Sequence, residues 1–187
     1  MFQPTQILRN EHEVILKALN VLEDCCELIR QGTAVPPETL ESLIEFFRLY
    51  ADRCHHGKEE DLLFPALEAK GIPREGGPIG CMLHEHEQNR ALTRAMLQAV
   101  AELRSGNAEA LQTWAETAEQ YSEVLSEHIY KENNILFVMA ERAFSEAEEP
   151  ALMARFNQVN DEKIGRAEIT RLEAMVGTIA GSLHATA

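Results

Sequence analysis

Two short stretches of the sequence place a glutamate four residues after a histidine. The stretch "HHGKEE" contains His55 and Glu59, and the stretch "HIYKE" contains His128 and Glu132. Side chains four residues apart lie on the same face of a helix, so both members of such a pair can reach one ion. Imidazole nitrogens and carboxylate oxygens together suit iron or manganese, and zinc less specifically. The spacing therefore predicts metal ligands on two helices.

Two further histidines extend this candidate site to other parts of the chain. His12 lies on the apolar stripe that contains Leu8 and Ile15, and His86 lies close to Met82. A single histidine on an apolar face is more often a core residue, and a single His–Glu pair is more often a surface ion pair. Two such pairs and two more histidines, each on its own helical segment, favour a metal site instead.

The segments that carry these residues have the apolar periodicity of long amphipathic helices. They run over approximately residues 6–30, 38–70, 79–103 and 108–143, and Pro- or Gly-containing stretches separate them. Short connections between long helices predict an all-α protein with an antiparallel up-down-up-down four-helix bundle. We assign residues 1–146 to this bundle and residues 147–187 to an additional C-terminal helical segment.

The positions of the candidate ligands along these helices predict that they meet. His12 lies about 19 residues before the end of the first segment, and His56 lies about 19 residues after the start of the second. His86 and His128 lie at matching distances from the turn between the third and fourth segments. Since a helix rises about 1.5 Å per residue, all four sets fall at nearly one level of the bundle.

Two buried glutamates at this level predict a pair of cations, because unpaired carboxylates in a core carry a large desolvation cost. Bundles with glutamate and histidine on facing helices commonly hold two ions. If both glutamates and one oxo or hydroxo oxygen bridge two iron ions, five histidines fill all but one of the remaining octahedral positions. The open position suits a small diatomic ligand such as dioxygen or nitric oxide. The candidate ligands are His12, His55, His56, Glu59, His86, His128 and Glu132.

The combined motifs resemble those of hemerythrin-like, or HHE cation-binding, proteins over roughly residues 7–143. The resemblance rests on "EH" at residues 11–12, "HHGKEEDLLFP", "EHEQNR" preceded by "GGPIGCML", and "HIYKENNILF". It implies a four-helix bundle with an oxygen-bridged, non-haem di-iron centre. Proteins of this kind bind dioxygen, act as sensors, or handle nitric oxide, peroxide or iron. The ligands that the resemblance implies are His12, His55, Glu59, His86, His128 and Glu132.

Two assignments within this ligand set have alternatives. The stretch "HHGKEE" also fits the register His56 and Glu60, but the resemblance favours His55 and Glu59. The fifth imidazole is His56 or His84, because the HxxxH pair of oxygen-carrying hemerythrins is absent from the third segment. On an α-helix His84 is turned about 200° from His86, whereas His56 is turned only about 100° from His55. We therefore take His56 as the fifth imidazole.

Composition limits the partners and the compartment. The net charge of −14 argues against nucleic acid and anionic membranes as partners. No apolar run is long enough to span a bilayer, and the first residues lack the apolar core of a signal peptide. The four cysteines form neither a zinc-type pair nor a disulfide framework, so we expect reduced thiols in a cytoplasmic protein. His184 lies in the tail and is expected to be exposed, and the oligomeric state is left open.

Two classes of function fit these features. The favoured one is a non-haem di-iron protein that binds dioxygen or nitric oxide for sensing, storage or stress protection. The alternative is a di-iron oxidoreductase that acts on peroxide or nitric oxide, or a repair protein that donates iron. The sequence shows no motif for binding an organic substrate, which favours binding and leaves catalysis open.

Overall fold

The protein is built from long helices with short connections. The computed structural model describes residues 2–186, with side chains up to residue 183. The side chain of His184 lies outside the described residues. The first and third long helices are α1 and α4; the second consists of α2, η1, η2 and α3, and the fourth of α5, η3 and α6. The bounds are α1 Gln3–Arg30, α2 Pro37–Phe46, η1 Phe47–His56, η2 Glu59–Leu63, α3 Phe64–Ala69, α4 Pro78–Arg104, α5 Ala110–Lys131, η3 Glu132–Leu136, α6 Phe137–Ala143, α7 Glu149–Lys163 and α8 Arg166–Thr186.

Proline and glycine explain where these helices begin and end. Pro37 and Pro78 lie in the first turn of α2 and α4, where the N–H that proline lacks would have no partner within the helix. Gly32 and Gly106 follow α1 and α4 with φ values of 77° and 99°, a conformation that glycine adopts without steric cost. These sharp endings reverse the chain within a few residues, so that successive long helices run antiparallel.

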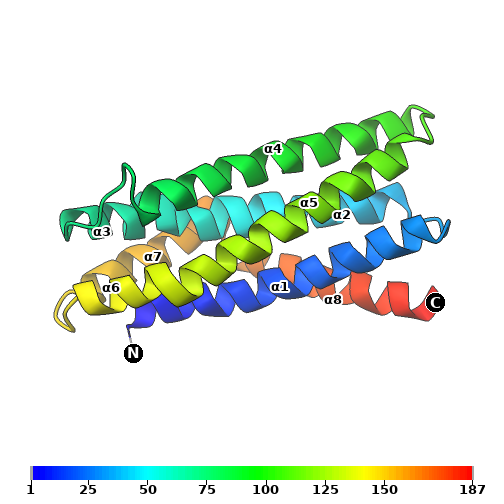
Figure 1. The fold of residues 1–187 in the computed structure, drawn as a ribbon. Coiled ribbons are helices and arrows are strands. Elements are labelled where there is room, and N and C mark those ends of the chain that lie inside the picture. The colour runs from blue at the N-terminus through cyan, green and yellow to red at the C-terminus, as the bar shows by residue number, and fades with distance from the viewer. Residues whose placement is uncertain (1, 187) are drawn as a thin grey trace.

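The four long helices form the predicted antiparallel bundle, as Figure 1 shows. In this bundle α4 packs against α5 and α2, and α1 packs against α5 and the second long helix. The predicted all-α fold is therefore confirmed. Among the described residues, no helix combines the length and apolar character that crossing a membrane requires.

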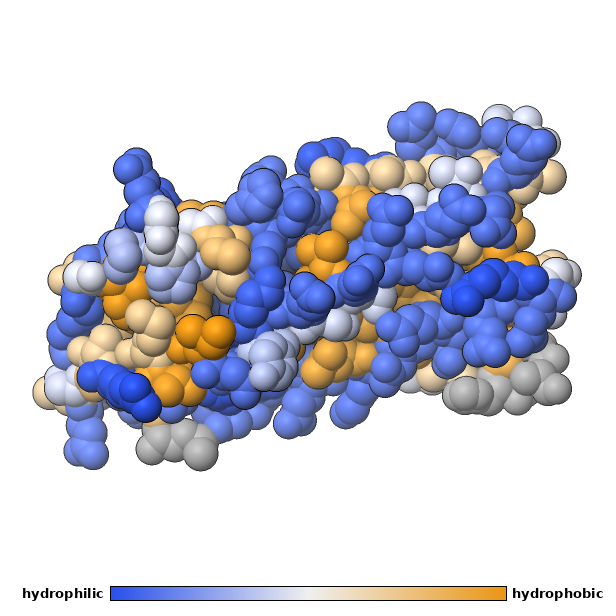
Figure 2. Space-filling model, in the orientation of Figure 1, coloured by the Kyte–Doolittle hydropathy of each residue, from blue (hydrophilic) through white to orange (hydrophobic). Residues whose placement is uncertain are grey.

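The core consists of two apolar clusters with a polar layer between them. One cluster includes Ile15, Ala51 and Leu125, and the other includes Leu8 and Leu136. Each long helix passes from one cluster to the other, and the candidate ligands lie where it does so. Figure 2 shows hydrophilic side chains over most of this face, with a patch of apolar side chains at its left-hand end and smaller apolar areas near the middle.

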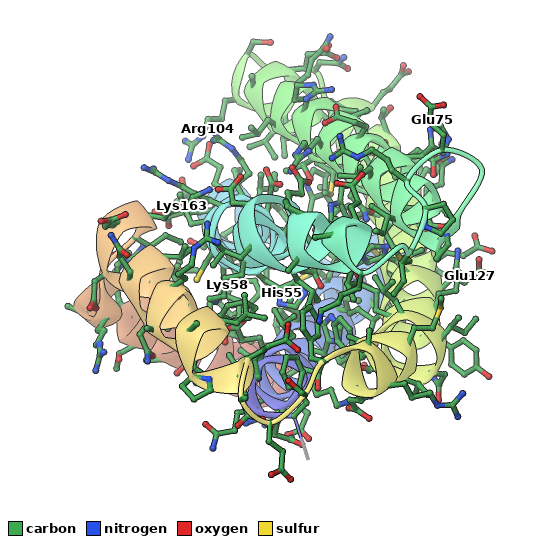
Figure 3. The ribbon with its side chains drawn as sticks, turned by 90° about the vertical axis from the view of Figure 1, so that its left-hand side faces the viewer. His55, Lys58, Glu75, Arg104, Glu127 and Lys163 are labelled. Carbon is green, nitrogen blue, oxygen red and sulfur yellow. The ribbon has the colours of Figure 1, made fainter. Side chains whose placement is uncertain are left out.

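The predicted C-terminal helical segment consists of two helices, α7 and α8, that pack on the bundle. They lie against α1 and the second long helix, on the side away from α4, as the end-on view in Figure 3 shows. Phe156 and Leu172 are almost fully buried in this interface. Gly165, with a φ of 86°, separates α7 from α8. The small residues near the C-terminus continue α8 through Thr186. The division of the chain after residue 146 stays a prediction.

Candidate metal centre

The structure brings all seven predicted ligands together in the polar layer. Each is buried, with at most 2% of its surface exposed. They come from all four long helices, as the matched distances from the turns predicted. The residues are His12 from α1; His55, His56 and Glu59 from the second long helix; His86 from α4; and His128 and Glu132 from the fourth.

The ligand atoms form two overlapping groups, and within each group they lie within 4.8 Å of one another. Such spacing is what several side chains around one ion require. Glu59 belongs to both groups. The first group is His56, Glu59, His86 and His128, and the second is His12, His55, Glu59 and Glu132.

The two carboxylates face histidines of both groups. The Oε1 atom of Glu59 lies 3.6 Å from Nε2 of His55, and its Oε2 atom lies 3.5 Å from Nε2 of His86. The Oε2 atom of Glu132 lies 3.2 Å from Nε2 of His12 and 3.3 Å from Nε2 of His128. Both carboxylates are therefore placed where they could bridge two ions.

Unpartnered polar atoms show that this layer fits a metal. The Nε2 atoms of His12 and His55, and both carboxylate oxygens of Glu59 and Glu132, are buried without a hydrogen bond in the described structure. Buried polar groups are almost always hydrogen-bonded, because leaving them unpaired costs free energy. Cations between the carboxylates and imidazoles would remove that cost.

The arrangement of His86 and His128 leads to the same conclusion. Their Nε2 atoms lie only 3.1 Å apart, while their Nδ1 atoms lie 2.7 Å from Glu60 and 3.0 Å from Glu85. A neutral imidazole has one N–H, and here it lies on Nδ1, where it donates a hydrogen bond to the carboxylate. Two nitrogen lone pairs would then face each other, so this pair requires a cation: a proton in the metal-free protein or a metal ion.

A ring of hydrogen-bonding side chains orients four of the histidines. Glu11 on α1 contacts Nδ1 of His55, and Glu60 on the second long helix contacts that of His86. Glu85 on α4 contacts Nδ1 of His128, and Asn133 on the fourth helix contacts that of His12 at 3.0 Å. Each helix thus fixes a histidine of the next helix around the bundle, leaving Nε2 free for a metal.

Sequence reasoning missed this ring, although a signal for it exists. Glu11, Glu60, Glu85 and Asn133 are each the immediate sequence neighbour of a predicted ligand. A neighbour on a helix is turned by about 100°, so it points toward the adjacent helix while the ligand points to the centre. A polar residue beside each inward histidine or glutamate is therefore the pattern to look for.

The residues left open by the sequence have distinct positions. His56 is buried in the first group, whereas His84 is exposed and belongs to neither group. Glu59 faces the interior. Glu60 is 25% exposed and contacts Nδ1 of His86 and the guanidinium group of Arg90. The π-helical segment η1 carries both His55 and His56. Its wider turn rotates less per residue than an α-helix, which lets both side chains face inward.

Three residues after His55, the fully buried side chain of Lys58 was not recognised from the sequence. Lys58 binds Glu11, and its Nζ atom lies 3.3 Å from Sγ of Cys54. Figure 3 shows His55 and Lys58 on the inner side of the second long helix. Glu11 therefore neutralises a buried cation and holds an imidazole at the same time.

Burial and neighbouring charges shift the pKa values within the metal-free layer. Burial, reinforced by nearby histidines, lowers the pKa of His56 and of His86 to about 3. Burial also opposes protonation of His128, but Glu132 and Glu85 outweigh it and raise its pKa to about 9. Burial and the charge of Glu132 raise the pKa of Glu59 well above its usual value. The layer thus retains protons that bound metal ions would displace.

These shifts predict that the metal-free protein loses stability as the pH falls from about 6.5 toward 3. Burial keeps His55, His56 and His86 neutral in the folded state, whereas in the unfolded chain they are protonated below about pH 6.5. The unfolded state then binds more protons, and each extra proton lowers the free energy of unfolding by about 1.4 kcal/mol per pH unit. Burial raises the pKa of Glu59 and of Glu11, so these two carboxyl groups act in the opposite sense above about pH 4.5 and offset part of this loss of stability.

Urea unfolding of the metal-free protein at about pH 7, 6 and 5 measures this dependence. The variant H84Q is the control, since His84 is exposed and outside the layer. Its free energy of unfolding is expected to change with pH as steeply as that of the parent protein. A free energy of unfolding that is constant over this range would contradict the prediction.

Comparisons with known proteins agree with the site. Residues 3–140 match the family described as the Hemerythrin HHE cation binding domain. The iron-sulfur cluster repair protein YtfE of Musicola paradisiaca (strain Ech703) is 28% identical over 141 residues, covering 73% of this chain and 62% of the relative. The protein of the same name from Edwardsiella ictaluri (strain 93-146) is 30% identical over 132 residues, covering 69% of this chain and 59% of the relative.

Other matches extend further along the chain. An uncharacterized protein of Mycobacterium tuberculosis (strain ATCC 25618 / H37Rv) is 22% identical over 180 residues, covering 96% of this chain and 69% of the relative. This chain spans about three fifths of the length of the two YtfE proteins. No solved structure matches it significantly. The family match covers most of the chain and includes all the histidines and glutamates of the buried layer, so this protein belongs to the hemerythrin HHE cation-binding family.

Proposed function

We propose that this protein is a non-haem di-iron protein that binds a small diatomic ligand, dioxygen or nitric oxide, for sensing, storage or stress protection. The observation that carries the proposal is that Glu59 and Glu132 each face histidines of both ligand groups. When bound, a pair of iron ions would supply a redox-active centre with affinity for such molecules. In this proposal His56, His86 and His128 would hold one ion, His12 and His55 would hold the other, and Glu59 and Glu132 would supply carboxylate oxygens to both.

The surroundings of the layer support a small ligand of low polarity. The ring of Phe137 stacks on that of His12, with centroids 5.5 Å apart, and the ring of Phe64 lies 5.8 Å from that of His86. Both phenylalanines are fully buried. These rings offer no hydrogen-bonding groups to a polar organic substrate, whereas a diatomic molecule needs none.

Metal analysis and an absorption spectrum of aerobically purified protein test this proposal. We expect two irons per chain and the charge-transfer bands of an oxo-bridged pair. The variant H56Q is expected to lower iron occupancy or shift these bands, because it removes a buried imidazole from the first group. The matched variant H84Q, which alters an exposed histidine, is expected to change neither. One iron or none in the parent protein, under iron-replete conditions, would refute the di-iron proposal.

Exposure of the reduced protein to dioxygen then separates binding from turnover. A spectral change that reverses when dioxygen is removed supports a binding protein. Irreversible oxidation accompanied by consumption of added peroxide supports the oxidoreductase alternative instead.

A second candidate function is the donation of iron to damaged iron–sulfur clusters. The observation that favours it is the name of two relatives, iron-sulfur cluster repair protein. Incubating the iron-loaded protein with an apo-ferredoxin and measuring iron transfer tests this candidate. The complete burial of the proposed ligands favours retention of the metal over its release, so we expect slow transfer, and rapid transfer would favour the repair function.

A further inference from the structure

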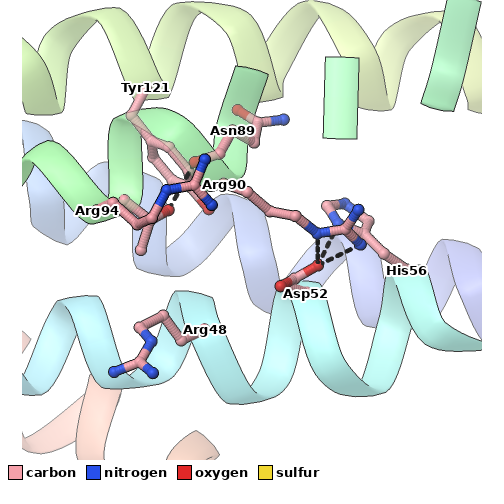
Figure 4. A pocket seen from close by; sticks show the side chains of 8 residues that line it. Arg48, Asp52, His56, Asn89, Arg90, Arg94 and Tyr121 are labelled. Carbon is pink, nitrogen blue, oxygen red and sulfur yellow. Dashed lines mark hydrogen bonds and ion pairs between the residues drawn. The ribbon is translucent and has the colours of Figure 1, made fainter. Parts of the chain in front are cut away.

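A pocket of about 250 Å³ lies beside the polar layer, between η1 and α4, with Tyr121 of α5 also lining it. Figure 4 shows it from close by. His56 forms part of its wall, so the pocket adjoins the first group of proposed ligands. None of the functions considered above uses the other residues that line it.

The pocket is lined by an excess of positive charge, although the protein as a whole carries a net charge of −14. Three arginines line it (Arg48, Arg90 and Arg94), against a single carboxylate, Asp52. Arg90 is already neutralised, since it binds Asp52 and two further carboxylates outside the pocket. The guanidinium groups of Arg48 and Arg94 are therefore the ones available to a ligand.

These two arginines come from different helices on opposite sides of the pocket. Figure 4 shows Arg48 on the second long helix and Arg94 on α4, with the guanidinium of Arg48 pointing away from that of Arg94 in this view. Both are exposed, and neither makes an ion pair or hydrogen bond to another residue in the described part of the chain. Both are long, solvent-exposed side chains that can rotate toward an anion in the pocket, and each guanidinium group can donate two parallel hydrogen bonds to a pair of charged oxygens.

Asn89 provides a second, independent indication of a ligand. It lines the same pocket, only 2% of its surface is exposed, and neither its amide nitrogen nor its amide oxygen has a hydrogen-bond partner in the described structure. An unsatisfied buried amide costs free energy that a ligand oxygen could recover. The amide NH₂ group can donate to the same anion as the arginines.

We propose that this pocket binds a compact oxyanion, a phosphate or a short carboxylate, through Arg48, Arg94 and Asn89. Its volume corresponds to roughly eight water molecules. That is smaller than the cavities that hold drug-sized molecules, so the pocket suits a small anion. The proposal goes beyond diatomic binding at the metal centre and does not depend on it, because none of the three residues belongs to the ligand groups.

Isothermal titration calorimetry on the purified, metal-loaded protein tests the proposal with two probes, inorganic phosphate and acetate. Ionic strength is held constant with chloride. We expect saturable binding of at least one probe to one site per chain, and the probe that binds identifies the class of oxyanion. The double variant R48Q/R94Q is expected to weaken this affinity about tenfold or more, because two charge-assisted contacts are lost.

The matched control is the double variant R142Q/R155Q. Arg142 and Arg155 are also exposed and lie outside the pocket. Replacing them changes the net charge of the protein by the same amount as R48Q/R94Q does. This control is expected to retain the parent affinity. The variant N89L, which removes the amide at nearly constant size, is expected to weaken binding several-fold.

Absence of saturable binding for both probes would overturn the proposal, and so would affinity that R48Q/R94Q leaves unchanged. Equal weakening in R142Q/R155Q would also overturn it, since the effect would then come from net charge alone. Iron analysis of the same samples separates this question from the proposed function. Anion binding in a protein that holds no iron pair would refute the di-iron proposal and leave the pocket in place.

Discussion

Replacing Glu59 by glutamine is expected to reduce the iron content of the purified protein from two ions per chain to one or none. Glu59 is the residue that the two ligand groups share, and its two oxygens face His55 and His86 on opposite sides. Glutamine keeps the shape of the side chain but cannot supply the negative charge and the second oxygen donor that bridging requires. Elemental analysis and the absorption spectrum of the E59Q variant measure the loss.

The variant E60Q is the matched control for this experiment. Glu60 is the neighbouring carboxylate, but it contacts Nδ1 of His86 and the guanidinium of Arg90 instead of facing the two groups. It acts by orienting a ligand, so we expect E60Q to retain both ions with an affinity about 10- to 100-fold weaker. The opposite outcome, with iron lost from E60Q and kept in E59Q, would establish the register His56 and Glu60.

Replacing Glu11 by leucine is expected to lower the free energy of unfolding by about 3–5 kcal/mol. Glu11 binds the ammonium group of Lys58, which is fully buried, and also holds Nδ1 of His55. Without this carboxylate, a buried positive charge and a buried imidazole N–H both lose their partner. Urea unfolding of the metal-free protein at neutral pH measures the effect without a contribution from metal binding.

Adding K58M to E11L isolates the contribution of the buried charge. Burial raises the pKa of Glu11 even though Lys58 opposes the shift, so desolvation outweighs the attraction within this pair. The double variant E11L/K58M is therefore expected to recover most of the stability that E11L loses. A loss of less than about 1 kcal/mol in E11L would contradict this account, since it would mean that Lys58 finds another partner or reaches water.

The sequence alone predicted the bundle and the level at which its polar residues meet. Apolar periodicity of three and four residues and short Pro- and Gly-containing turns depend on local backbone geometry, which is readable from a single chain. Because the helical rise is constant, distances from the turns placed His12, His56, His86 and His128 in one layer, and the structure places them there. Their role as iron ligands stays a prediction.

Contacts between helices were decided only by the tertiary structure. Glu11, Glu60, Glu85 and Asn133 each serve a histidine on another helix, and such pairing depends on how neighbouring helices are rotated and spaced. The π-helical segment that carries His55 and His56 is a departure from regular α-helix that apolar periodicity does not predict.

The same distinction applies to the residues outside the layer. Lys58 looks like any surface lysine in the sequence, and only the packing of α1 against the second long helix shows that it is buried beside Glu11. The arginine-lined pocket likewise joins residues from helices that are distant in the chain. Periodicity and spacing therefore determined which residues point inward and at what height, whereas the partners of each charge emerged only once the helices were packed, because a charge finds its partner through space.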